Sequence, residues 1–335
     1  MNADNKRVLF ICPAFFGYEV SITDALINNG YIVDFFDERT SNSSIYKAIF
    51  RVRKDLLSAA IKKYYTQILN KIQHTTYHYF FLIKGEVVPE WFIIEFKKLN
   101  PNAKLIYYTY DSFNNNNAHS IYILKHFDAC YSFDFEDVIK KPALKLKHLF
   151  YTDEFETKND DKLPKYLISF VGTLHSARYT VVKKLFSNFT NAFMFFYMPA
   201  KWFFLMEKIF KKSYRTIKWD DVCFDKLSKK QVADIFKISK SVMDIQRNGQ
   251  TGLTMRTFEV LASGAILITT NPYIKQTDFY SEDRVVVINE KFSEESVIEI
   301  KKKIDASKAK DPSFQLKFER YNVNNWVRDF FINID

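Results

Sequence analysis

The sequence predicts an α/β protein of two domains, each built on a mostly parallel sheet. Short apolar runs of strand type alternate with amphipathic helical segments, which is the pattern of βαβ units. At 335 residues the chain is long enough for two domains of about 150 residues each. The acidic, polar run DEFETKNDDK at 153–162 is the best linker candidate. We therefore expect domains at 1–152 and 165–312, followed by a helical segment at 313–335.

In the first domain, two acids follow expected strands on the side where open α/β sheets bind ligands. Glu19 ends the loop after the first strand, and Asp111 follows a later strand directly. Each has a local alternative: Glu19 as a first-turn acid favoured by the helix dipole, and Asp111 as a turn residue. The expected strands are 7–12, 31–36, 77–83, 104–108 and 127–131, and the expected helices are 21–29, 44–74 and 89–99.

The second domain begins with a strand that ends in Gly172-Thr173, a small turn ahead of a helix with Arg178 in its first turn. Such a turn can hold phosphates, although a plain βα turn is the alternative. Ser228 to Gln231 reads as a capping box. The expected strands are 166–171, 192–198, 242–245, 265–269 and 285–288, and the expected helices are 177–189, 201–212, 228–239, 293–306 and 313–332.

The stretch 246–271, QRNGQTGLTMRTFEVLASGAILITTN, carries the most chemical information. Thr254 is expected to cap a short helix that Gly264 ends. Arg256 in the first turn adds a cation to the phosphate-binding helix N-terminus. Glu259, one turn later, can accept hydrogen bonds from a ribose diol. The alternative is an ordinary amphipathic helix with a surface Arg–Glu pair.

The run Glu259–Gly264 resembles the E-x-x-A-x-G signature of GT-B glycosyltransferase donor domains. The longer run around it resembles the spore-maturation (CgeB-like) branch, common in bacterial capsule and O-antigen gene clusters. The resemblance implies two Rossmann-like domains facing across a cleft, with a last helix that crosses back to the first domain. It also implies an arginine near the diphosphate and a glutamate near the ribose. Thr251 stands where many retaining members carry a second acid, so the stereochemistry stays open.

The resulting hypothesis is a glycosyltransferase that moves a sugar from a nucleotide-diphosphate donor to a hydroxyl of a bacterial surface glycan. Asp111, or else Glu19, would be the general base if the enzyme inverts. No D-x-D motif is evident, so we expect no metal and no cofactor besides the donor. The alternatives are a non-catalytic nucleotide- or glycan-binding protein and another Rossmann-type enzyme, such as a dehydrogenase. The donor site would comprise Gln246, Gly252, Leu253, Thr254, Arg256, Glu259, Gly172, Thr173 and Arg178.

The composition limits which binding partners and which cellular compartment we expect. The net charge of +10 favours anionic partners, but no nucleic-acid-binding motif is present, so none is expected. The three cysteines, Cys12, Cys130 and Cys223, form neither a disulfide framework nor a zinc motif. No signal peptide or long apolar run occurs, so we expect a cytoplasmic protein.

The segment 201–218, KWFFLMEKIFKKSYRTIK, mixes aromatic and basic residues. It either contacts an anionic membrane, such as one that holds a lipid-linked acceptor, or packs into its domain. We favour packing, because the aromatic residues are contiguous rather than confined to one stripe.

Overall fold

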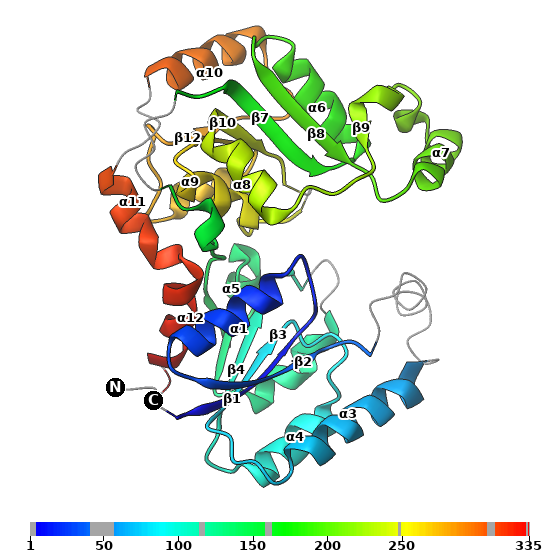
Figure 1. The fold of residues 1–335 in the computed structure, drawn as a ribbon, viewed down its shortest axis with the longest axis vertical. Coiled ribbons are helices and arrows are strands. Elements are labelled where there is room, and N and C mark those ends of the chain that lie inside the picture. Colours follow the sequence, from blue (N-terminus) through cyan, green and yellow to red (C-terminus); the bar gives the residue numbers. More distant parts are fainter. Residues whose placement is uncertain are drawn as a thin grey trace. The chain divides into compact units, whose positions relative to one another are not determined.

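The computed structural model describes residues 5–40, 57–113, 118–157, 163–246, 249–306, 312–332 and 334. The chain divides into two units: Met1–Leu149 with Val323–Asp335, and Phe150–Asn322. Within the described ranges, each unit holds one six-stranded parallel sheet with helices packed against it (Figure 1). The predicted α/β fold with two parallel-sheet units is confirmed.

The first sheet has the strand order β2-β1-β3-β4-β5-β6, and all its pairings are parallel. Its chain order reverses between β1 and β3, so ligands are expected beyond the carboxyl ends of these two strands. The strand β6 was not expected, because it has three residues and two of them are exposed. The strands are β1 Arg7–Cys12, β2 Ile32–Asp37, β3 Tyr79–Ile83, β4 Lys104–Thr109, β5 Ala129–Ser132 and β6 Leu144–Leu146.

The helices of the first unit bury aromatic and aliphatic side chains on this sheet. The first helix begins at Tyr18, earlier than predicted, because Gly17 adopts a φ of 77° and redirects the chain. The predicted basic helix at 44–74 is described only from residue 57 onward, and its remainder lies outside the described residues. The helices are α1 Tyr18–Asn28, α3 Ser58–Ile72, α4 Glu90–Leu99, η2 Ala118–His126, α5 Phe135–Lys140 and α12 Val323–Ile332.

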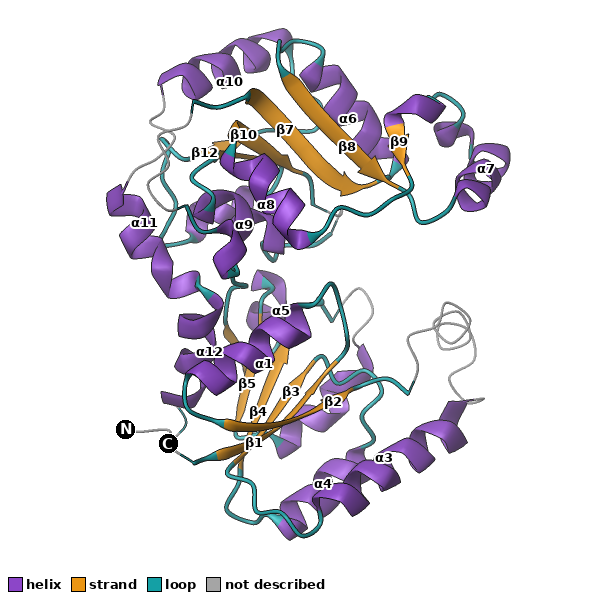
Figure 2. Ribbon diagram, in the orientation of Figure 1, coloured by secondary structure: helices purple, strands orange, loops and turns teal. Residues whose placement is uncertain are grey.

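The second sheet has the order β12-β11-β10-β7-β8-β9, which is the doubly wound order of dinucleotide-binding folds. Figure 2 shows β7 beside β8, with the helices of this unit around the sheet. Its switch point lies between β7 and β10, at the strand ends that carry Thr173 and Asp244. The strands are β7 Tyr166–Thr173, β8 Ala192–Tyr197, β9 Val222–Cys223, β10 Ser239–Asp244, β11 Ile266–Thr269 and β12 Val285–Val287.

The helices of the second unit include the predicted capping box. Ser228 accepts from the backbone N–H of Gln231, whose side chain in turn accepts from the backbone N–H of Ser228. The α-helices are α6 Ser176–Phe186, α7 Lys201–Phe210, α8 Lys229–Lys237, α9 Met255–Ala262, α10 Glu294–Ala306 and α11 Pro312–Phe318. The 3₁₀ helices are η3 Asp153–Phe155, η4 Lys212–Tyr214, η5 Trp219–Asp221, η6 Pro272–Gln276 and η7 Glu319–Tyr321.

The expected single helix at 313–332 is two helices. The helix is interrupted at Asn322, which has an extended backbone and donates a hydrogen bond to Asp153. The part before the break, α11 with η7, groups with the second unit, and Val323–Asp335 groups with the first. The first residues of the expected linker form the 3₁₀ helix η3, whose Phe155 is buried against Phe236 of α8. Its last residues, 158–162, lie outside the described residues.

Candidate functional site

Three of the predicted donor-site residues, Thr173, Arg178 and Gln246, lie at the switch point of the second sheet. The Arg178 guanidinium donates to the carbonyl of Ile245 at 2.7 Å and to that of Thr173 at 3.3 Å, so it bridges the ends of β10 and β7. Gln246 follows directly, and its side-chain carbonyl is buried without a hydrogen-bond partner among the described residues. The unsatisfied acceptor thus belongs to the residue that directly follows the Ile245 carbonyl to which Arg178 donates.

The prediction of a phosphate-holding turn at Gly172-Thr173 is wrong in its local structure. Both residues lie within β7 and pair with Phe196 and Tyr197 of β8. A Cβ at 172 would lie 2.8 Å from the ring of Phe170, so any larger residue there would force that buried ring to shift. The turn starts one residue later, so Thr173 belongs to the strand end.

Thr254 occupies the N-cap position of α9, but its side chain makes no capping bond. The hydroxyl instead donates to Asp244 at 2.6 Å, and the Thr257 hydroxyl donates to the same oxygen at 3.2 Å. Asp244 is the buried last residue of β10 and was not identified from the sequence. The available signal was an acid that ends an apolar strand. This carboxylate fixes the start of α9 to the sheet edge.

Arg256 and Glu259 form an ion pair 3.2 Å apart on α9. The glutamate side chain is only 5% exposed and the arginine 24%, with the guanidinium 4.9 Å from the ring of Phe236. Ser263, the C-cap residue of α9, is buried, and its hydroxyl donates to the carbonyl of Val260. Glu259 and the ring of Phe236 therefore position the Arg256 guanidinium, which is partly exposed to solvent, at the N-terminus of α9.

The loop that leads into α9 is held from the end of β11. The Asn271 side chain donates to the carbonyls of Thr251 and Gly252, at 3.1 and 3.3 Å. Leu253 is buried, so its side chain belongs to the core and only its backbone is available to a ligand. Asn271 was not identified from the sequence, since nothing local indicates which loop it contacts.

In the first unit, Asp111 follows β4, and its carboxylate lies 2.7 Å from the ammonium of Lys84. The lysine side chain is 10% exposed and the aspartate 42%. The backbone of Asp111 also makes turn bonds with the Thr109 hydroxyl, at 2.7 and 3.1 Å. The local turn expected as the alternative is thus present, and it leaves the carboxylate free to pair with Lys84.

Lys84 lies just past β3 in a left-handed conformation, with φ of 76°. Its ammonium also contacts Glu86 at 3.2 Å. Burial lowers the pKa of Lys84, but the carboxylates of Asp111 and Glu86 raise it more, so the net shift is upward. The sequence did not indicate this lysine, because its partner carboxylate comes from the next strand of the sheet.

Glu38, just past β2, is completely buried. Its side chain accepts a hydrogen bond of 2.7 Å from the backbone N–H of Val87, in the loop after β3. Burial raises its pKa from 4.5 to about 7, and the charge of Lys84 opposes that rise. Glu38 is therefore a titratable group that is hydrogen-bonded to the loop that carries Lys84.

Glu19 lies in the first turn of α1 and accepts a hydrogen bond of 2.9 Å from the backbone N–H of Phe15. The Phe15 ring stacks on Tyr110, next to Asp111, with centroids 6.1 Å apart. Both candidate acids thus lie at the same edge of the first sheet. Glu19 therefore has the position that the alternative interpretation predicted, that of an acid in the first turn of a helix.

Other features of the described chain add no donor or acid site. The three cysteines are free thiols. Among the residues that the structure describes, no group of three or more His, Cys, Asp or Glu side chains is arranged to hold a metal ion. Within the same ranges, no helix is both long and apolar enough to cross a bilayer.

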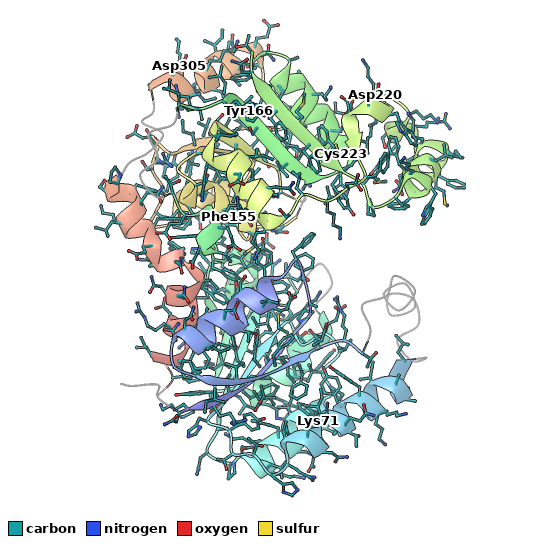
Figure 3. The ribbon with its side chains drawn as sticks, viewed as in Figure 1. Lys71, Phe155, Tyr166, Asp220, Cys223 and Asp305 are labelled. Atoms are coloured by element: carbon teal, nitrogen blue, oxygen red, sulfur yellow. The ribbon has the colours of Figure 1, made fainter. Side chains whose placement is uncertain are left out.

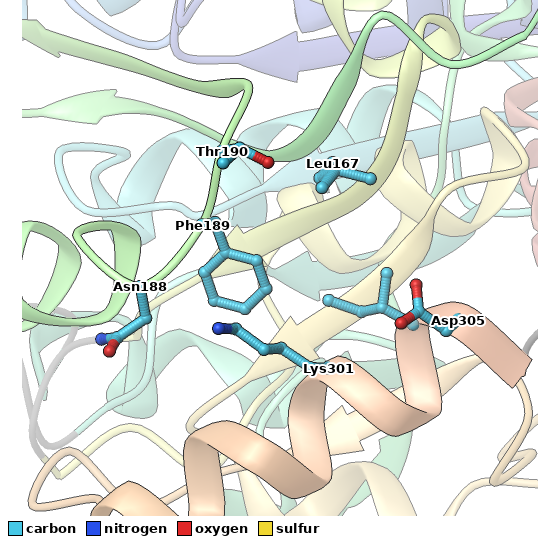
Figure 4. Close-up of a pocket in the computed structure, with 7 residues that line it drawn as sticks. Leu167, Asn188, Phe189, Thr190, Lys301 and Asp305 are labelled. Carbon is cyan, nitrogen blue, oxygen red and sulfur yellow. The ribbon is translucent and has the colours of Figure 1, made fainter.

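One small hollow of about 180 Å³ lies in the second unit, close to the start of β7 (Figure 4). It is therefore at the opposite end of that strand from Thr173 and holds none of the predicted site residues. Its lining is Leu167, Asn188, Phe189, Thr190, Lys301, Ile304 and Asp305.

Comparisons with known proteins agree with this architecture. The sequence model of a family described as "Glycosyl transferase-like" matches residues 207–313, which include α9. A search of curated protein sequences found no match.

Solved structures resemble the whole chain. The lipopolysaccharide outer core galactosyltransferase WaaB matches with 11% identity and a TM-score of 0.57, covering 98% of each chain. HepE of Anabaena, in complex with UDP-glucose, matches with 9% identity and a TM-score of 0.62, covering 98% of this chain and 99% of that one. AviGT4, a glycosyltransferase of avilamycin A biosynthesis, matches with 10% identity and a TM-score of 0.61, covering 98% and 97%. These likenesses show that the fold is that of GT-B glycosyltransferases.

Proposed function

We propose that this protein is a glycosyltransferase that moves a sugar from a nucleotide-diphosphate donor to a hydroxyl group. The observation that carries the proposal is the family match over 207–313, because it contains α9 with Arg256 in its first turn. The fold supports it, since similar structures include a galactosyltransferase and a protein in complex with UDP-glucose.

The donor is assigned to the carboxyl edge of the second sheet. The N-terminus of α9 offers unpaired N–H groups and a partial positive charge, and Arg256 adds a cation that can hold a phosphate bidentately. Glu259, one turn further along α9, is assigned to the ribose. Gln246 supports the assignment, because its buried carbonyl needs a donor that a ligand can supply.

The acceptor chemistry is assigned to the carboxyl edge of the first sheet. For an inverting transfer, the Asp111 carboxylate takes the proton of the acceptor hydroxyl as its oxygen attacks the anomeric carbon. The bond between that carbon and the diphosphate breaks, and the diphosphate leaves with the electron pair. Arg256 and the N–H groups of α9 offset its charge, so no step of the proposal uses a metal. Glu19 is the second candidate base.

The acceptor we propose is a bacterial surface glycan, of capsule or lipopolysaccharide O-antigen, on a lipid-linked carrier at the cytoplasmic face. The resemblance of 252–271 to the CgeB-like branch supports this source, and so does the likeness to a lipopolysaccharide galactosyltransferase. Peripheral contact with the membrane follows from such an acceptor.

A screen of nucleotide sugars tests the function. Thermal shift against UDP-, GDP- and dTDP-sugars should find one class that raises the melting temperature, and that donor should be hydrolysed slowly or transferred. Binding without any turnover would favour a non-catalytic nucleotide-binding protein. Quenching of nicotinamide fluorescence with no response to nucleotide sugars would instead favour a dehydrogenase.

A further inference from the structure

Helix α7 exposes an apolar stripe to solvent. Its five members recur at the spacing of one helix face, and their exposed fractions run from 45% to 75%. Figure 3 shows α7 with its side chains at the right-hand edge of the second unit. The members are Trp202, Leu205, Met206, Ile209 and Phe210.

The opposite face of α7 anchors the helix to its unit. Phe204 is completely buried and contacts the rings of Trp219 and Phe224. Lys208 donates to the carbonyl of Ile217 at 2.8 Å. The helix therefore turns charged residues and one phenylalanine inward, and its larger apolar face outward. This orientation contradicts the expectation that the aromatic residues pack into the domain.

The charge around the stripe is one-sided. The segment 201–218 contains six Lys or Arg residues and one acid, Glu207. That acid is already paired with Lys211 at 2.6 Å. Lys201, Lys212, Arg215 and Lys218 are exposed beside the helix. Two copies of this chain packed stripe to stripe would bring these like charges together, so the charge disfavours self-association.

We propose that α7 lies in the headgroup region of an anionic lipid bilayer, with the stripe inserted and the basic residues at the phosphates. Large aromatic and aliphatic side chains on one face, flanked by lysines, are what an interfacial helix requires. Anionic lipid complements the charge, and the acyl boundary covers the exposed apolar surface. The inference stands on α7 alone and does not depend on glycosyl transfer.

Vesicle co-sedimentation of the full chain tests the proposal. At 50 mM NaCl the protein should bind vesicles of phosphatidylcholine with phosphatidylglycerol, and bind phosphatidylcholine alone more weakly. High salt should weaken the binding to anionic vesicles because it screens the charges. Trp202→Ser with Phe210→Ser should weaken binding about tenfold or more, since two large apolar side chains no longer insert. Lys212→Gln with Lys218→Gln should remove most of the preference for anionic lipid.

A matched control uses exposed apolar residues elsewhere. Ile139 on α5 and Leu316 on α11 are as exposed as the stripe, so changing both to Ser should leave vesicle binding unchanged. An unaltered melting temperature verifies that each variant is folded. The proposal fails if the wild-type protein does not bind anionic vesicles, or if the Trp202 and Phe210 variant binds as well as wild type. A dimer that dissociates in that variant, with no vesicle binding, would make the stripe a contact between copies.

Discussion

Each candidate site pairs a buried charge with a more exposed one. Lys84 is mostly buried and its partner Asp111 is more exposed, whereas on α9 Glu259 is buried and Arg256 is the exposed member. In both pairs the buried ion limits where the exposed one can lie, and the exposed one remains available to a ligand. The same arrangement thus offers a carboxylate in one unit and a guanidinium in the other.

Arg256→Ala should weaken binding of the donor nucleotide about ten- to a hundredfold, through loss of a charge-assisted bond to phosphate. It should also lower the melting temperature, because the buried Glu259 carboxylate loses its ion pair with Arg256. Calorimetric titration with the nucleoside diphosphate measures the first effect. The double variant Arg256→Ala with Glu259→Gln controls for the second, since it also removes the buried charge of Glu259. Unchanged nucleotide affinity in both variants would exclude Arg256 from the donor site.

Asp111→Asn should reduce turnover by about two to four orders of magnitude, the usual contribution of a general base. Donor affinity should remain near wild type, because a general base acts on the acceptor hydroxyl and does not hold the nucleotide. Steady-state transfer assays and nucleotide titration measure the two quantities separately. Turnover close to wild type would make Asp111 a turn residue, and Glu19→Gln would then be the next variant.

At the scale of elements, hydrogen bonds between successive strand ends position the loops. Asp244 fixes α9 to β10, and Asn271 holds the loop before α9 from β11. In the first unit, Glu38 after β2 holds the loop after β3 through Val87. Because these side chains are polar and buried, breaking one of these hydrogen bonds would leave a buried polar group without that partner.

The buried carboxyl of Glu38 should make stability depend on pH. Its pKa is about 7 in the folded protein and near 4.5 in an unfolded chain, so between these values only the folded state binds the proton. Stability from this group is therefore lost as the pH rises from about 4.5 to 7. Relative to wild type, Glu38→Gln should gain up to about 3 kcal/mol over that window, at about 1.4 kcal/mol per pKa unit.

Urea unfolding of wild type and Glu38→Gln at several pH values measures that difference. Glu95→Gln is a suitable control, because Glu95 is partly exposed and pairs with Lys98 on the same helix. A difference between Glu38→Gln and wild type that does not change with pH would mean that Glu38 titrates normally.

At the scale of the whole molecule, the end of the chain completes the first unit. Trp326 and Phe330 of α12 are buried on Tyr108, and the Trp326 indole N–H donates to the carbonyl of His148 at 2.7 Å. Phe331 packs on Tyr79 of β3. The first sheet therefore depends on residues that follow the entire second unit in sequence.

Trp326→Ala should destabilise the first unit by about 3–5 kcal/mol, the usual cost of truncating a buried tryptophan. Ile332→Ala on the same helix should have little effect, since Ile332 is exposed. Thermal unfolding compares the two, while nucleotide titration reports whether the second unit stays intact. Equal melting temperatures for both variants would mean that α12 contributes little to the core.

The sequence by itself determined the features that depend on neighbouring residues. Runs such as YFFLI at 79–83 are strands because they are short, apolar and fully buried. The helix that contains Arg256 and Glu259 follows from its spacing and from Gly264 at its end. The capping box at Ser228 is equally local.

Only the tertiary structure decided the contacts between distant residues. Lys84 meets Asp111 because β3 and β4 are neighbours in the sheet, and Asp244 meets Thr254 because α9 folds back on the end of β10. The spacing of the apolar residues on α7 was present in the sequence, but not which face of α7 would be outward. The buried Phe204 fixes that orientation, because its ring packs against Trp219 and Phe224, which follow the helix in sequence. The periodicity of apolar residues determines where helices and strands form. Which residues meet at the strand ends, and which face of a helix is exposed, depend on how those helices and strands pack.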